Sequence, residues 1–95
     1  MAYCVSHFFA GGTKDQYETG MIAINGALGV IPDGQILHVA GPVPGGWQVM
    51  AVQDSKESWN TFLNDLFIPI MSKGVPRSFT APPTVTEFDV THFYK

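Results

Sequence analysis

The chain has 95 residues and a net charge of −3, and 45% of its residues are apolar. Only 14% are charged, which is fewer than the about 25% of an average protein. Its five basic residues are scattered, which argues against nucleic-acid binding, and no apolar run approaches the roughly 18 residues of a membrane span. Cys4 is the single cysteine and the N-terminus lacks a signal-peptide pattern, so we expect a cytoplasmic protein without disulfides.

The N-terminal part of the chain predicts a strand followed by a helix. Residues 2–9 (AYCVSHFF) are β-prone, and Gly11-Gly12 end the run. Thr13 is the expected helix N-cap, because Gln16 stands three residues later and completes a capping box. Apolar residues follow at helical spacing, which predicts a helix that begins at this box.

Two ends of this first helix fit the pattern. Asn25-Gly26 is a typical helix C-terminus, and the apolar spacing also fits a helix that runs on to Leu28. Gly20 weakens the helix by about 1 kcal/mol relative to alanine, so we expect it to permit a close approach of the helix to the sheet. Residues 31–35 form the following loop, with its turn at Pro32-Asp33-Gly34.

Residues 36–54 (ILHVAGPVPGGWQVMAVQD) predict a β-hairpin. The expected strands are residues 36–41 and 47–53, and the sequence GPVPGG of residues 41–46 connects them. This connector is rich in glycine but lacks the Lys-Ser/Thr of a P-loop, and no helix follows it directly. We therefore expect no phosphate cradle there.

The C-terminal part predicts a helix, a long loop and a strand. Ser55 is the expected N-cap, and a broad apolar stripe runs from Trp59 to Met71 at helical spacing. Pro69 should kink or stop this helix. Residues 72–83 are rich in glycine and proline and form a loop, and residues 84–94 are the expected last strand.

This order of elements predicts an α+β fold. Strand, helix, hairpin, helix and strand give the ferredoxin-like βαββαβ pattern, as a single domain of residues 1–95. The expected sheet is four-stranded and antiparallel, with the strand order 4-1-3-2 and two helices on one face.

The middle strands are apolar on both faces. In the third strand, Val49 and Ala51 lie on one face, whereas Met50 and Val52 lie on the other. Sheets that are apolar on both faces are covered on both faces, and the low content of charged residues points the same way. We therefore expect a homodimer formed through the sheet face away from the helices. The alternative is a monomer with an unusually uncharged surface.

The chain resembles the dimeric α+β barrel proteins, a ferredoxin-like superfamily that includes antibiotic-biosynthesis-monooxygenase-type domains, small isomerases and some polyketide cyclases. The resemblance covers nearly the whole chain in the order and length of its elements. The best matching residues are 38–42 (HVAGP), 45–47 (GGW), 54–59 (DSKESW) and Phe62. These features are specific for the fold and not for one activity.

The resemblance implies a homodimer that binds an aromatic or polyketide-like small molecule in a pocket between sheet and helices. The lead hypothesis is a small cofactor-independent monooxygenase, or a related cyclase or isomerase, although no complete catalytic set of the family matches this chain. One alternative is a non-catalytic small-molecule-binding or stress-related structural homodimer, and another is a subunit of a hetero-oligomer. A cavity of about 300 Å³ or more would favour ligand binding.

Several polar residues interrupt the apolar strands, and histidine is the acid or base suited to neutral pH. His38 and His7 are the candidate catalytic residues; the alternative for each is a hydrogen-bonded histidine of the sheet. The candidate ligand-binding residues are Tyr3, Trp47, Trp59 and Phe62.

The expected topology separates the three histidines. An offset of about four residues places His7 roughly 13 Å from His92, and three strand spacings place His38 ~14 Å from His92. Zinc ligands must lie ~2 Å from one ion. We therefore expect no metal site within one protomer, while a site shared between protomers stays open. The resemblance implies that the protein needs no cofactor.

Overall fold

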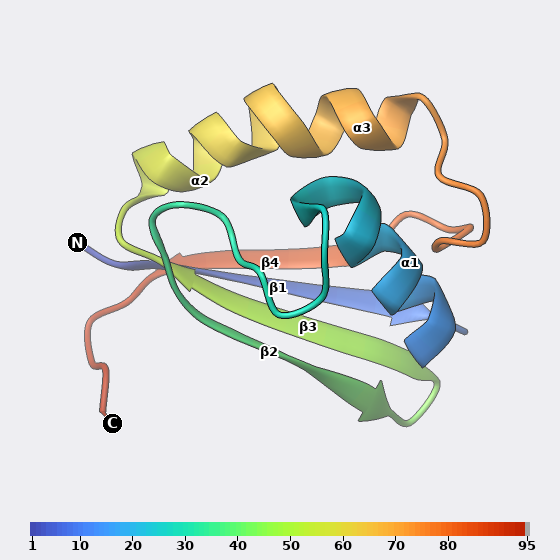
Figure 1. Ribbon diagram of the computed structural model, residues 1–95. Coiled ribbons are helices and arrows are strands. Elements are labelled where there is room, and N and C mark those ends of the chain that lie inside the picture. The colour runs from blue at the N-terminus through green and yellow to red at the C-terminus, as the bar shows by residue number, and fades with distance from the viewer. Residues whose placement is uncertain (95) are drawn as a thin grey trace.

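The computed structural model describes residues 1–94, which form a four-stranded antiparallel sheet with the helices on one face (Figure 1). The strand order β2-β3-β1-β4 is the predicted order 4-1-3-2 read from the other edge, so the predicted ferredoxin-like α+β fold is confirmed. The elements are β1 (Tyr3–Ala10), α1 (Lys14–Asn25), β2 (Gln35–Val43), β3 (Gly46–Gln53), α2 (Lys56–Phe62), η1 (Leu63–Phe67), α3 (Ile68–Ser72) and β4 (Thr84–Asp89).

Helix α1 begins and ends at two local caps. The Thr13 hydroxyl accepts a hydrogen bond from the Gln16 backbone N–H, and the Gln16 side chain accepts one from the Thr13 N–H, so the predicted capping box is confirmed. Gly26 ends the helix in the left-handed conformation at φ 85°, with its N–H bonded to the carbonyl of Ile22. Of the two predicted ends, the structure has the one at Asn25 and not the one at Leu28.

Gly20 permits a close approach, but to a loop and not to the sheet. A Cβ atom at this position would lie 2.8 Å from the Oγ atom of Ser78. Ser78 is itself buried, and its hydroxyl donates to the backbone carbonyl of Gln16. The glycine therefore lets the segment after α3 close over α1, which sequence spacing could not indicate.

The hairpin strands are longer than predicted. β2 continues through Val43 and β3 begins at Gly46, so the turn is reduced to Pro44-Gly45, with Gly45 at φ 86°. Pro42 lies within β2 and pairs with Trp47. A proline is tolerated there because β2 is an edge strand.

The second helix continues past Pro69, so the predicted stop at this residue is wrong, and the departure from α-helical geometry comes one turn earlier. A π-helical turn, η1, joins α2 to α3, and Pro69 follows it within the first turn of α3. In a regular α-helix the proline ring would meet the carbonyl four residues earlier; the wider π turn ends just before this point. The helix reaches Ser72, and its ribbon runs without a break over the sheet (Figure 1).

The last strand is shorter than the predicted residues 84–94. β4 ends at Asp89, and the backbone N–H of Val90 still bonds to the carbonyl of Ala2. The chain then turns to the side of the sheet opposite the helices (Figure 1).

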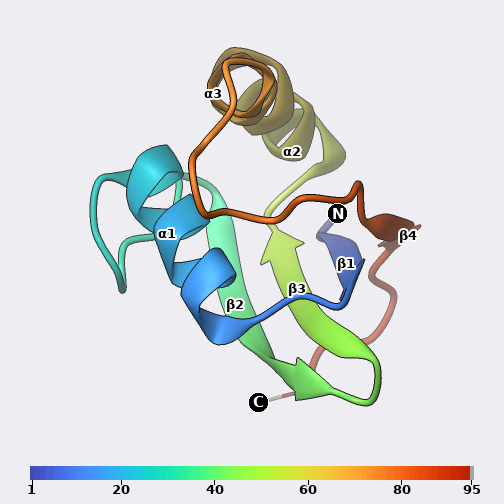
Figure 2. The same ribbon diagram turned by 90° about the vertical axis from the view of Figure 1, so that its right-hand side faces the viewer.

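The burial of β1 shows which face of the sheet meets the helices. Tyr3 and Val5 form a buried cluster with Trp59 of α2, so the odd-numbered residues of β1 point toward the helices. Figure 2 shows the two layers edge-on, with all helices of residues 1–94 on one side of the sheet. Four apolar side chains on that open face are 38% to 49% exposed: Leu37, Val39, Met50 and Phe88.

An irregularity in β2 brings two polar residues onto the helix side. The pairing of β2 with β3 shifts between Gln35 and Leu37, and Ile36 is the extra residue of this β-bulge. In a regular strand, Gln35 and His38 would face opposite sides because they are three residues apart. The bulge places both side chains toward the helices, where they are hydrogen-bonded to each other.

Candidate functional site

A cavity of about 340 Å³ lies between the sheet and the helices. Its walls come from β1, β2, β3, α1, the α2–α3 helix and the loop of residues 78–83. The volume lies at the lower end of the range of about 300–1,000 Å³ that is usual for ligand pockets. Most of the lining is apolar, and its aromatic and histidine side chains include His7, Phe9, Tyr17, His38, Trp59 and Phe62.

Four of the six predicted site residues line this cavity, namely His7, His38, Trp59 and Phe62. The cavity lining does not include Tyr3 or Trp47. Tyr3 packs in the core cluster, and its hydroxyl bonds to a residue of β4. Trp47 is buried behind Tyr17, with 5.3 Å between the ring centroids. Binding and catalytic roles for these residues stay predictions, and the cavity lining gives no support to those of Tyr3 and Trp47.

His38 belongs to a chain of side-chain hydrogen bonds that begins at Tyr17. Its Nε2 atom lies 2.5 Å from the hydroxyl oxygen of Tyr17 on α1, and its Nδ1 atom lies 2.8 Å from Oε1 of Gln35. The Gln35 amide nitrogen donates to Gln53 at 2.8 Å, and the Gln53 amide nitrogen donates to the hydroxyl of Ser58 at 3.1 Å. The chain therefore links α1 to the first turn of α2 through two strands.

Burial decides the charge of the polar groups at this end of the cavity. Loss of water contact lowers the pKa of His38 below its usual value, because the charged imidazolium is poorly solvated there. The same burial raises the pKa of Tyr17, and the nearby charge of Glu18 raises it further. At neutral pH the pair is therefore an uncharged imidazole facing a protonated phenol.

His7 has an aromatic environment. Its ring lies 5.8 Å from the Trp59 ring, 6.2 Å from that of Phe9 and 6.4 Å from that of Phe67, measured between centroids. Burial lowers the pKa of His7, and the charge of Glu87 opposes this effect. His7 is thus a second uncharged base in the cavity wall.

The two histidines face the same cavity from different strands. His7 pairs with Val49 and His38 pairs with Ala51, so β3 lies between them. Two strand spacings and an offset of two residues place their Cα atoms roughly 12 Å apart. Both side chains lie on the helix side of the sheet and line the same cavity.

Sequence reasoning missed Tyr17 and Gln35 as site residues. Tyr17 counts as one of the apolar positions of α1 in the helical pattern, and its partner His38 is 21 residues away in the sequence. Gln35 was expected in a loop, and only the β-bulge brings it beside His38. The aromatic stacking of Phe79 on Phe9, with 3.7 Å between centroids, likewise brings an expected loop into the cavity wall.

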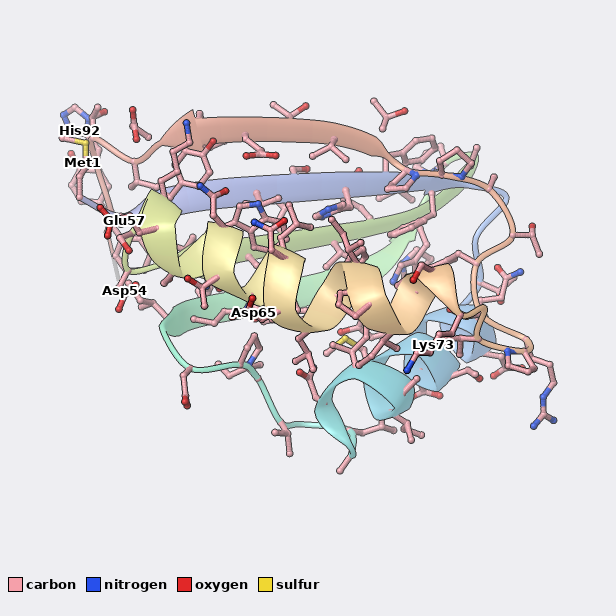
Figure 3. All side chains as sticks on the ribbon, turned by 90° about the horizontal axis from the view of Figure 1, so that it is seen from above. Met1, Asp54, Glu57, Asp65, Lys73 and His92 are labelled. Carbon is pink, nitrogen blue, oxygen red and sulfur yellow. The ribbon has the colours of Figure 1, made fainter. Side chains whose placement is uncertain are left out.

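Residues 1–94 contain no group of three or more His, Cys, Asp or Glu side chains placed to hold a metal ion. His92 and Met1 both lie at the end of the molecule where α2 begins (Figure 3). Within the same residues, no helix has the length and apolar character needed to cross a membrane.

A ferredoxin-like sheet with a cavity beneath its helices defines the structural class of this protein. No protein-family model and no curated protein matches the sequence. Among solved structures, the chain is similar to a protein from Chloroflexus aurantiacus J-10-fl that carries the provisional designation of antibiotic biosynthesis monooxygenase. The TM-score is 0.67 at 17% identity, over 100% of this chain and 98% of that one. The likeness confirms the fold expected from the resemblance.

Proposed function

We propose that the protein is a small enzyme that binds an aromatic or polyketide-like molecule in this cavity and removes a proton from it. The reaction is a monooxygenation without a bound cofactor, or a related cyclisation or isomerisation. The similar structure from Chloroflexus aurantiacus supports the reaction class by analogy of fold. The observation that carries the proposal is the uncharged His38, which lies 2.5 Å from the Tyr17 hydroxyl in the wall of an apolar cavity.

The chemistry needs a base and an electron-rich substrate. Loss of a proton from a phenol or enol gives an anion, which can pass electrons to O₂. For an anthrone the overall reaction converts a CH₂ group and O₂ into a C=O group and water. The four electrons that reduce O₂ come from the carbon that is oxidised, so the balance needs no external reductant. His38 and His7 are the candidate bases, and the apolar wall limits access of water to the anion.

Oxygen uptake in the presence of 1,8-dihydroxyanthrone tests this proposal. We expect uptake above the rate without protein, and a decrease in kcat/KM of about 10²-fold or more in His38→Gln, as for loss of a general base. His92→Gln is the matched control, because His92 does not line the cavity, and it should keep the wild-type rate. Binding without oxygen uptake would favour an isomerase, a cyclase or a non-catalytic carrier, and absence of binding would refute the proposal.

A homodimer is part of the proposal. The open face of the sheet carries Leu37, Val39, Met50 and Phe88 in exposed positions, and two such faces packed together remove them from water. This is the arrangement that both the two-sided apolar strands and the resemblance imply. We further propose a location in the cytoplasm, where the buried thiol of Cys4 stays reduced.

A further inference from the structure

In the series of hydrogen bonds that links His38 to α2, each residue donates to the next one toward α2. This donor-to-acceptor direction is fixed by an acceptor at the start of α2. The main-chain carbonyl of Ser55 can only accept, and the Ser58 hydroxyl donates to it at 3.3 Å. The Ser58 oxygen is then left as the acceptor for the amide nitrogen of Gln53 at 3.1 Å. The orientation of the Gln53 amide follows from this bond.

The orientation of the Gln53 amide in turn fixes the orientation of the Gln35 amide and the tautomer of His38. Gln53 presents its Oε1 atom to the amide nitrogen of Gln35, so Gln35 presents its own Oε1 atom to Nδ1 of His38. Two acceptors cannot bond to each other, which means that Nδ1 carries the hydrogen. Gln53 is 0% exposed. If its side-chain amide rotated by half a turn, no water could reach it to replace the lost hydrogen bonds.

A neutral imidazole with hydrogen on Nδ1 has a free electron pair on Nε2. That pair accepts the hydroxyl hydrogen of Tyr17 at 2.5 Å, which leaves the other lone pair of the Tyr17 oxygen without a donor from this chain of bonds. Both Tyr17 and His38 line the cavity. We propose that Tyr17 and His38 act as one proton-accepting pair, in which the Tyr17 oxygen contacts an acidic hydroxyl of the substrate, while Gln35 and Gln53 are positioning residues that set the His38 tautomer.

This inference rests on the proposed function and names the substrate group: a phenolic or enolic hydroxyl. Its O–H bond breaks, and the proton goes to the Tyr17 oxygen while the Tyr17 proton goes to Nε2 of His38. The products are a substrate oxyanion and an imidazolium, so charge balances. The carbonyl oxygen of Gln35 faces the Nδ1–H of this imidazolium and stabilises its positive charge.

The tautomer of His38 can be measured in the ligand-free protein by ¹⁵N NMR of the imidazole rings, with the His38 signals assigned from their loss in His38→Gln. We expect hydrogen on Nδ1 in the wild type. Gln35→Leu removes the acceptor and should abolish this preference, whereas Gln35→Glu keeps an acceptor and should retain it. Gln48→Leu is the matched control, because the Gln48 amide bonds to Ser6 and has no link to His38.

Hydrogen on Nε2 in the wild type, or an unchanged tautomer in Gln35→Leu, would overturn the positioning role. Tyr17→Phe tests the contact with substrate: kcat for 1,8-dihydroxyanthrone should fall about 10²-fold or more, with a much smaller change in KM. An unchanged kcat in this variant would overturn the pair but leave the proposed function standing. The expected tautomer together with no binding of 1,8-dihydroxyanthrone by the wild type would instead refute the proposed function and leave the positioning role standing.

Discussion

Tyr3 donates the hydrogen of its hydroxyl to a carboxylate oxygen of Glu87 on the neighbouring strand β4, with 2.8 Å between the two oxygens. This bond is the main reason that the pKa of the Tyr3 phenol is raised, and burial and the charges of Glu87 and Asp89 add to it. The hydroxyl is thereby engaged in joining β1 to β4, outside the cavity lining. Tyr3 is therefore a structural link between strands.

We expect Tyr3→Phe to keep the wild-type affinity for 1,8-dihydroxyanthrone, because the hydroxyl does not reach the cavity. Phe62→Ala is the comparison, since Phe62 lines the cavity and its loss should weaken binding. A fluorescence titration measures both. Weaker binding in Tyr3→Phe, at unchanged fold, would contradict this placement of Tyr3.

Trp59 should contribute much of the free energy that holds the second helix on the sheet. It is 4% exposed and packs on Tyr3 and Val5, so Trp59→Ala should lower the free energy of unfolding by about 3–5 kcal/mol. The indole N–H has no hydrogen-bond partner within residues 1–94, so Trp59→Phe should cost clearly less. Urea denaturation measures both values. An equal loss in the two variants would contradict this ranking.

The fold was predictable where local sequence rules suffice. Thr13 and Gln16 form the capping box that their spacing indicates, and alternation of side chains along the strands was enough to predict an apolar open face. Pro69 was a poor guide to the end of the second helix, because a π turn precedes it and the helix continues to Ser72.

The candidate site was predictable only in part. His7 and His38 stood out as polar residues in apolar strands, and both reach the cavity. Tyr17 and Gln35 did not stand out, because their contacts with His38 arise from tertiary packing and from the β-bulge at Ile36. Pairings of this kind carry no signal in the spacing of a single sequence.

Stability should decrease as the pH falls from about 7 toward 5. Burial lowers the pKa values of His7 and His38 from the ordinary value of 6.5. Between these lowered values and 6.5, the unfolded chain binds more protons than the folded one, so the free energy of unfolding rises with pH. The contribution is present above pH 6.5 and is lost as the pH falls through the folded-state pKa values.

Chemical denaturation at several pH values measures this dependence. In the double variant His7→Phe, His38→Gln, the loss of stability between pH 7 and pH 5 should be smaller than in the wild type. His92→Gln serves as the control for removing an exposed histidine. A double variant with the same pH dependence as the wild type would mean that neither ring resists protonation in the folded state.

The open face of the sheet should be the dimer interface. Val39→Lys places a charge on this face and should shift the protein from dimer to monomer in sedimentation velocity at micromolar concentration. Ile22→Lys on α1 is the matched control, because Val39 and Ile22 are both 49% exposed but lie on opposite sides of the sheet. A monomeric wild type, or an equal response of the two variants, would contradict this interface.

The occupancy of the cavity can be tested directly by titrating the wild-type protein with 1,8-dihydroxyanthrone while following the ring signals of its three histidines by ¹H–¹³C NMR. Binding between sheet and helices predicts saturable shifts of His7 and His38, with His92 unchanged. Shifts confined to His92 or to the methyl groups of Leu37 and Val39 on the open face, or no shift at all, would contradict a ligand site in the cavity.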